Sequence, residues 1–167
     1  NIMIIVLISG LITAAVGILF GLPSLRIKGF YLAVATLASQ FFLVWLFNKV
    51  PWFYNYSDTG QITVSERLMF GIPVTGATAP PYATYLFCLI LVVLLGFAAK
   101  NLIRSKIGRS WMAIRDMDIA AEIIGVPPLK TKLSAFAISS FYIGVAGALY
   151  FAVFLGAIEV TESFDIM

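Results

Sequence analysis

Hydrophobic and polar residues are arranged along the chain in long blocks. Four blocks are almost free of charged residues and cover approximately residues 2–22, 29–48, 82–99 and 133–158. An apolar run of about 20 residues is long enough to cross about 30 Å of hydrocarbon as an α-helix. These runs are too long for barrel strands, and lipid demands that backbone hydrogen bonds be satisfied internally. The pattern predicts an all-α, polytopic transmembrane helical bundle with four spans in a single domain.

Small residues recur every four positions in the first and fourth predicted spans. The two series are Ser9, Thr13, Gly17 and Gly21, and Ser140, Gly144, Ala148 and Ala152. Small side chains let two helices approach closely, which drives association inside lipid. Chance in a glycine-rich helix is the alternative explanation. We expect both helices to pack inside the bundle. The third span is bulky and aliphatic from Leu86 to Leu95, and we expect it to face lipid.

Polar residues lie at membrane depth in the second predicted span. Thr36 and Gln40 are one helical turn apart, and Ala33 shares their face. Polar groups at this depth usually face the protein interior, where they line a path or bond to a neighbouring helix. Both roles stay open for these residues.

The loop over residues 49–81 is rich in turn residues. It begins with the aromatic residues Trp52, Phe53, Tyr54 and Tyr56, a composition typical of the membrane–water boundary. Its prolines and glycines exclude a further continuous span. Residues Val64 to Phe70 are predicted to form a short interfacial helix.

The loop over residues 100–132 is the longest polar interruption between two strongly apolar segments. Helix formers extend from Met112 to Ile124, and Gly125 is followed by two prolines, which is a stop signal. Asp118 is expected to cap a short second helix over Ile119–Ile124. Helical spacing gives one polar face and one small apolar face. The polar face holds Arg115, Asp118 and Glu122, and the apolar face holds Trp111, Ile114, Ala121 and Ile124. Such a loop suits docking against a soluble partner, or it is an amphipathic connector without one.

The basic residues predict the orientation. Seven of the 11 Lys and Arg residues lie in the loop over residues 100–132. Positive charge stays on the cytoplasmic side, so we expect this loop to be cytoplasmic. Alternation of the spans then places Arg26 and Lys28 inside as well. It places the loop over residues 49–81 and the acidic C-terminal end outside.

Composition excludes several classes of function. The chain is 61% hydrophobic and 11% charged, whereas soluble domains carry roughly 25% charged residues. It has no histidine, the commonest metal ligand and the usual general base near neutral pH. Cys88 is the only cysteine, and no phosphate-binding loop motif occurs. We therefore expect no catalytic residue, metal or cofactor, and any ATP would be bound by another chain. The acids among the basic residues give nucleic-acid binding little support.

Three stretches carry a resemblance to a known family. They are GRSWMAIRDMDIAAEIIGV (residues 108–126), KLSAFAISSFYIGVAGALYF (132–151) and GLPSLRIKGFYLAVATLA (21–38). They resemble permease subunits of bacterial ABC importers for branched-chain amino acids. Permeases of ABC importers carry a cytoplasmic pattern of Glu-Ala-Ala, three residues and Gly. Ala120, Ala121 and Gly125 fit it, and Ile119 stands at the glutamate position, a departure common in this subfamily.

The resemblance implies a multi-pass protein of the cell inner membrane that is not an enzyme. It implies contacts with membrane lipid, cytoplasmic ABC ATPase subunits, a second permease subunit, and a periplasmic or extracellular substrate-binding protein. The implied ATPase-coupling residues are Arg109, Arg115, Asp118, Ala120, Ala121, Glu122 and Gly125. Ala33, Thr36 and Gln40 are candidates for the translocation path. The chain is expected to be an internal piece of a longer permease.

Three alternatives remain at this stage. A relative of the same design would carry urea, short amides or other amino acids. A multi-pass membrane enzyme would need charged residues positioned inside the spans, and none falls there. A channel or packing subunit without ATP coupling would not copurify with an ATPase.

Overall fold

The computed structural model describes residues 2–26, 30–50, 52, 61–63, 67–69, 72–75 and 79–159. Some side chains within this set, that of Ala33 among them, are outside the description. The helices are α1 (Ile2–Arg26), α2 (Phe30–Lys49), α3 (Pro81–Arg104), α4 (Lys106–Asp116), α5 (Asp118–Ile123) and α6 (Pro128–Leu149). A π-helix, η2 (Tyr150–Leu155), continues α6. The strands are β1 (Gln61–Thr63), β2 (Arg67–Met69), β3 (Ile72–Thr75) and β4 (Ala157–Glu159).

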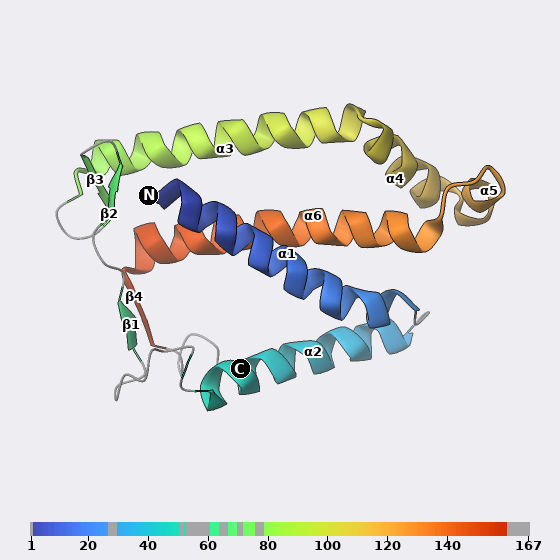
Figure 1. The fold of residues 1–167 in the computed structure, drawn as a ribbon, viewed down its shortest axis with the longest axis horizontal. Helices are drawn as coiled ribbons and strands as arrows, with labels where there is room; N and C mark the ends of the chain where they lie inside the picture. The colour runs from blue at the N-terminus through green and yellow to red at the C-terminus, as the bar shows by residue number, and fades with distance from the viewer. Residues whose placement is uncertain are drawn as a thin grey trace.

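Helix α6 runs through the middle of the molecule, with α3 on one side of it and α1 crossing it (Figure 1). Helix α2 lies beyond α1, and Phe20 of α1 meets Phe42 of α2 with ring centroids 6.1 Å apart. Helices α4 and α5 gather at one end of the molecule, together with the C-terminal end of α1. The strands gather at the opposite end. The molecule therefore has a helical end, with α4 and α5, and a strand end.

The predicted close packing of the first and fourth spans is confirmed. Helices α1 and α6 touch through their small residues, and Gly10, Gly17 and Gly144 all lie at the contact. The Ser9 hydroxyl on α1 donates to the Gly144 carbonyl on α6 at 3.4 Å. This is the geometry expected when packing, and not the hydrophobic effect, drives association.

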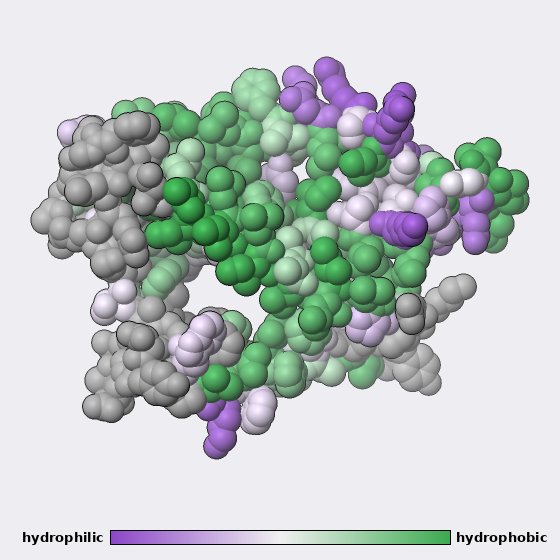
Figure 2. Space-filling view, viewed as in Figure 1, coloured by the Kyte–Doolittle hydropathy of each residue, from purple (hydrophilic) through white to green (hydrophobic). Residues whose placement is uncertain are grey.

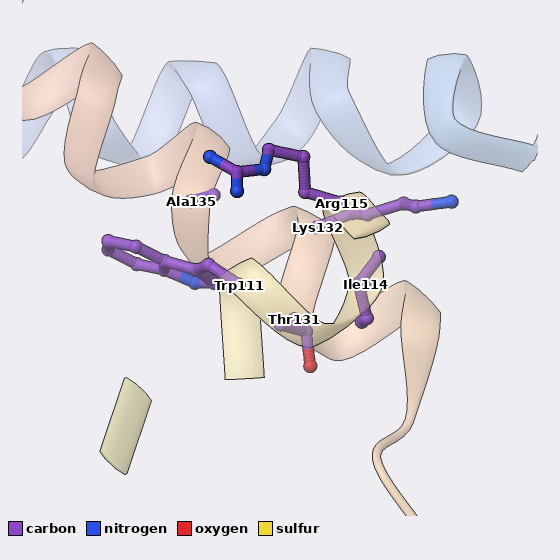
Figure 3. A pocket seen from close by; sticks show the side chains of 6 residues that line it. All are labelled: Trp111, Ile114, Arg115, Thr131, Lys132 and Ala135. Atoms are coloured by element: carbon purple, nitrogen blue, oxygen red, sulfur yellow. The ribbon is translucent and has the colours of Figure 1, made fainter. Parts of the chain in front are cut away.

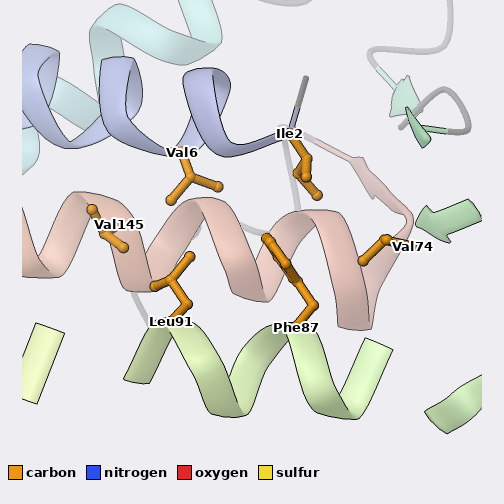
Figure 4. Packing of buried hydrophobic residues seen from close by; sticks show 6 residues of the cluster. All are labelled: Ile2, Val6, Val74, Phe87, Leu91 and Val145. Carbon is orange, nitrogen blue, oxygen red and sulfur yellow. The ribbon is translucent and has the colours of Figure 1, made fainter. Parts of the chain in front are cut away.

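A small apolar core joins three helices at the strand end of the molecule. It contains Ile2 and Val6 of α1, Phe87 and Leu91 of α3, Val145 of α6 and Val74 of β3 (Figure 4). The expectation that the third span faces lipid is therefore only partly right. Most of its aliphatic side chains are exposed, but Phe87 and Leu91 lie one turn apart on the face that meets α1 and α6. A helix that is apolar on every side gives no periodic signal for this face.

Three of the described helical segments are long and apolar enough to cross a membrane. They are Ile2–Pro23, Pro81–Arg104 and Pro128–Val153. The second predicted span corresponds to α2, a helix of 20 residues that is not among these three. The crossing of α2 stays a prediction. Hydrophobic side chains cover much of the visible surface of the long helices, and hydrophilic ones gather around the ends of α3 and α4 (Figure 2).

Two short antiparallel strand pairs were not predicted. β1 pairs with β4, so Ile62 of the long loop lies opposite Ile158 after the last helix. β2 pairs with β3, and Arg67–Met69 is therefore a strand within the stretch predicted as an interfacial helix. That prediction was wrong for these residues, because backbone pairing with β3 satisfies their hydrogen bonds as well as a helix would. Residues 64–66 and 70, and the aromatics Phe53, Tyr54 and Tyr56, lie outside the described residues.

Candidate functional site

The polar loop connects the end of α3 to the start of α6 and contains the helices α4 and α5. Ser105 separates α3 from α4 with an extended backbone, and its Oγ accepts from the Gly108 amide at 3.4 Å as an N-cap. A methyl group on Gly108 would lie 2.6 Å from the Ile103 Cα, so only glycine fits inside this turn. The serine three residues before the glycine was the available sequence signal for this boundary, and the prediction that began the helix at Met112 missed it.

The break between α4 and α5 falls at Met117, whose φ of −151° and ψ of 97° are extended. A short second helix was predicted, and α5 confirms it at Asp118–Ile123. The prediction that Asp118 caps this helix was wrong. Met117 is the N-cap, without a side-chain hydrogen bond, and Asp118 is the first helical residue. The Asp118 Oδ2 instead accepts from the Lys132 Nζ of α6 at 2.6 Å.

Gly125 ends α5 as predicted. Its φ is +89°, in the left-handed region that glycine adopts without strain. The Gly125 amide donates to the Glu122 carbonyl at 3.0 Å, and the Val126 amide donates to the Ala121 carbonyl at 3.0 Å. This pair of bonds is the Schellman arrangement, which satisfies carbonyls at a helix end.

The residues of the predicted apolar face differ in exposure. Ile114 and Ala121 are buried within the chain, Ala121 at 2% exposure, while Ile124 is exposed. The grouping of Ile124 on one face with Ile114 and Ala121 was therefore wrong, because Ile124 is the C-cap of α5, with a φ of −82° and a ψ of 7°, and lies beyond the helix. Ala121 packs inside this chain.

The predicted ATPase-coupling residues other than Ala121 lie at the surface. Arg109, Arg115, Asp118, Ala120, Glu122 and Gly125 are all exposed. The Arg115 Nε donates to the Asp116 Oδ1 at 3.0 Å, with both side chains well solvated. A pair of this kind contributes little to stability.

Two side-chain contacts fix the loop onto the start of α6. The Trp111 Nε1 donates to the Ser134 Oγ at 2.9 Å, and the Ser134 Oγ donates to the Thr131 carbonyl at 2.8 Å. The ion pair between Lys132 and Asp118 anchors α5 to the same helix. A shallow hollow of about 250 Å³ lies between α4 and α6 (Figure 3). Its lining residues are Trp111, Ile114, Arg115, Thr131, Lys132 and Ala135.

Four large apolar side chains project from α5 and its two ends. Met117, Ile119, Ile123 and Ile124 are each between 70% and 82% exposed. We call these four residues the apolar tip, and Figure 2 shows hydrophobic surface at this end of the molecule. A contiguous exposed apolar patch with a polar rim marks an interaction surface. The short helix predicted over Ile119–Ile124 contains three of these four side chains, but none of the four is among the predicted coupling residues.

The candidate path residues lie apart from this loop, on α2. Thr36 and Gln40 are exposed there, and the side chain of Ala33 is outside the description. Among the described residues, no group of three or more His, Cys, Asp or Glu side chains is placed to hold a metal ion.

Comparison with known proteins gives a consistent result. A family model described as "Branched-chain amino acid transport system / permease component" matches residues 1–166. The high-affinity branched-chain amino acid transport system permease protein LivM of Salmonella typhimurium is 32% identical over 165 residues, which covers 87% of this chain and 38% of that protein. The LivM protein of Escherichia coli is 33% identical over 165 residues, with the same coverage of 87% and 38%.

A third relative is the "Probable ABC transporter permease protein y4mJ" of Sinorhizobium fredii. It is 29% identical over 156 residues, which covers 89% of this chain and 43% of that protein. The chain thus spans about 38% of the length of the two LivM relatives. No solved structure shows a significant match to it.

Proposed function

Because the chain belongs to the family of branched-chain amino acid transport system permease components, we propose that it forms part of the membrane-spanning subunit of an ATP-driven ABC importer. The proposed substrates are branched-chain amino acids, as the names of the LivM relatives state for those proteins. The observation that carries the proposal is the family match across residues 1–166. The proposed location is the cell inner membrane.

The proposed topology follows the charge asymmetry and the two ends of the molecule. The basic α3–α4 junction and α5 lie at one end with the end of α1, and we place this end in the cytoplasm. The strand pair β1–β4 supports the placement of the other end outside. It joins residues 61–63, in the loop predicted to be external, to residues 157–159 at the end of the fourth predicted span.

The proposed contact with a cytoplasmic ATPase is the apolar tip. Its isoleucines would enter a groove on the ATPase, and the exposed Arg109 and Glu122 would contact the rim of that groove. The Lys132–Asp118 ion pair and the buried Ala121 hold α5 against α4 and α6. A displacement of the tip would therefore be passed to α6, and from α6 to the closely packed α1. The ATPase, and not this chain, would hydrolyse ATP.

The remaining partners follow from the permease role. A second permease subunit would complete the translocation path, and an external binding protein would deliver the substrate to the strand end. We propose that Ala33, Thr36 and Gln40 face this path. Thr36 and Gln40 are exposed on α2, so a partner helix or the path itself would cover them in the assembled permease.

The experiment that tests the ATPase contact compares two variants of the same loop. Ile123→Arg places a charge at an exposed position of the apolar tip, and Met112→Arg places the same charge on exposed α4. Burial of an unpaired charge costs several kcal/mol, enough to weaken docking by orders of magnitude. We expect Ile123→Arg to insert normally, lose ATPase recovery in a detergent pull-down and lose ATP-driven uptake, while Met112→Arg keeps both.

Ala121→Arg is a poorer choice for this test. Ala121 is buried, so an arginine at this position would disrupt the loop itself. Undiminished ATPase recovery by Ile123→Arg would show that the apolar tip is not the docking element. Equal loss in both variants would assign the effect to the loop as a whole.

A further inference from the structure

The hollow between α4 and α6 is not accounted for by the ATPase contact. Six residues line it, three from α4 and three from the first two turns of α6, and no residue of α5 is among them. The apolar tip and the hollow are therefore separate surfaces of the same loop. The hollow is flanked by two cationic side chains, Arg115 and Lys132 (Figure 3).

The lining combines a cationic rim with an apolar floor. Ile114 and Ala135 supply aliphatic surface, and Trp111 supplies an aromatic ring whose N–H is already bound to Ser134. The Arg115 Nε is engaged by Asp116. A guanidinium has five N–H donors, so four donors of its terminal nitrogens are available to a second acceptor. Guanidinium groups match phosphate oxygens in two-pronged geometry.

The position of the hollow fits the boundary of a membrane. Thr131, Lys132 and Ala135 lie at the start of α6, inside the segment Pro128–Val153 that is long and apolar enough to span. Trp is enriched at this boundary because its ring is amphipathic. The hollow thus lies where the phosphate groups of the cytoplasmic leaflet would be, provided that this end is cytoplasmic.

The surrounding charge favours an anion. Seven basic residues and three acidic residues lie between positions 100 and 132. Asp116 pairs with Arg115 and Asp118 pairs with Lys132, so the excess of positive charge comes from the other basic residues of the loop. The hollow itself, about 250 Å³, is smaller than the roughly 300–1,000 Å³ of pockets that hold whole drug-sized ligands. It suits a phosphate with its glycerol backbone, while acyl chains would continue along the apolar surface of the spanning helices.

We propose that the hollow binds the phosphate headgroup of an anionic phospholipid from the cytoplasmic leaflet. Arg115 binds the phosphate oxygens, Lys132 adds a second positive charge, and Ile114 and Trp111 contact the glycerol and the first methylenes. An anionic lipid in this position contacts α4 and α6 together, and so supports the loop that carries the apolar tip. Basic pockets between helices on the cytoplasmic side are suited to such headgroups.

The test uses the full-length permease assembled with its partners in nanodiscs. Trp45→Phe and Trp52→Phe leave Trp111 as the only tryptophan among these 167 residues, and every tryptophan elsewhere in the full-length permease and in its partner subunits is replaced as well. The nanodiscs contain phosphatidylcholine with a small fraction of phosphatidylglycerol brominated near its headgroup. We expect the brominated phosphatidylglycerol to quench the fluorescence of Trp111 several-fold more than the same fraction of brominated phosphatidylcholine does.

Three variants distinguish the site from general attraction to the membrane. Arg115→Gln and Lys132→Gln should each lower the preference for the anionic lipid, by about fivefold for each cation removed. Asp118→Asn breaks the ion pair with Lys132 but keeps both cations, so it should keep or increase the preference. Arg109→Gln removes an exposed cation of α4 that does not line the hollow, and it should change little.

Each contrary result overturns the proposal. Equal quenching by the two brominated lipids would show that no headgroup site exists. An equal loss in Arg109→Gln and Arg115→Gln would show that only the overall charge attracts the lipid. Loss of the preference on addition of millimolar inorganic phosphate would assign the hollow to a soluble anion. A loss in Asp118→Asn as large as in Lys132→Gln would show that the ion pair, and not the cation, is what matters.

Discussion

The contact between α1 and α6 makes a prediction about a single methyl group. In Gly144→Ala the new Cβ would lie 2.6 Å from the Thr13 Cβ and 3.1 Å from the Gly10 Cα. Thr13 is held in place because its Oγ1 donates to the Ser9 carbonyl at 2.8 Å. The methyl group is therefore accommodated only if the two helices separate or Thr13 gives up this bond.

The magnitude follows from two opposing effects. Overpacking of a close contact costs about 1–3 kcal/mol. Replacement of glycine by alanine inside a helix gains roughly 0.5–1 kcal/mol. Gly147→Ala is the matched control, because Gly147 lies one turn away on α6 and a Cβ there meets nothing within 4 Å. The gain from helix propensity is common to both variants, so their difference isolates the packing cost of about 1–3 kcal/mol.

The assay is unfolding of each purified variant by sodium dodecyl sulfate in mild detergent, followed by circular dichroism. We expect Gly144→Ala to unfold at a lower denaturant fraction than the parent, and Gly147→Ala at the same or a higher one. When the chain also carries Thr13→Gly, the loss of stability caused by Gly144→Ala should be smaller, because contacting residues couple in a double-mutant cycle. The reasoning is refuted if the two alanine variants agree within about 0.5 kcal/mol, the usual error of additivity.

Three further predictions concern the loop, the topology and the path. Gly125→Ala should destabilise the end of α5 by about 1–2 kcal/mol, because φ is +89° there, and Gly125→Asn should recover part of this loss; hydrogen exchange of α5 measures it. With Cys88 replaced by Ala, an impermeant thiol reagent should label Thr161→Cys from outside intact cells, and labelling of Ser110→Cys would reverse the proposed orientation. Gln40→Leu should lower uptake while assembly is unchanged, and failure to assemble would make Gln40 a structural hydrogen-bonding residue.

Much of the fold could be predicted because spans carry a strong signal. The start of α3 at Pro81 and the end of α5 at Gly125 both coincide with proline or glycine in the sequence. The faces of the helices were harder to predict. Leu91 and its exposed neighbour Val92 are both aliphatic, and only packing against α1 and α6 distinguishes them.

The candidate site was predicted in position but not in detail. No glycine or proline marks the break at Met117. Helical spacing alone placed Ala121 and Ile124 on one face, although Ala121 is buried and Ile124, the C-cap of α5, is exposed. The pairing of β1 with β4 depends on residues far apart in the chain, which local patterns do not reveal. Non-local pairing of this kind is decided by tertiary context.

The pairing of the first long helix with the last has a consequence for biosynthesis. Ser9 and Gly144 are 135 residues apart in the sequence, yet they share a hydrogen bond. A ribosome adds about 5–20 residues per second, so α1 waits about 7–27 s for its partner to be synthesised. During that interval the small-residue face of α1 lacks the helix against which it packs in the folded protein. The contact between α1 and α6, with its hydrogen bond from Ser9 to Gly144, therefore forms only after α6 has been synthesised.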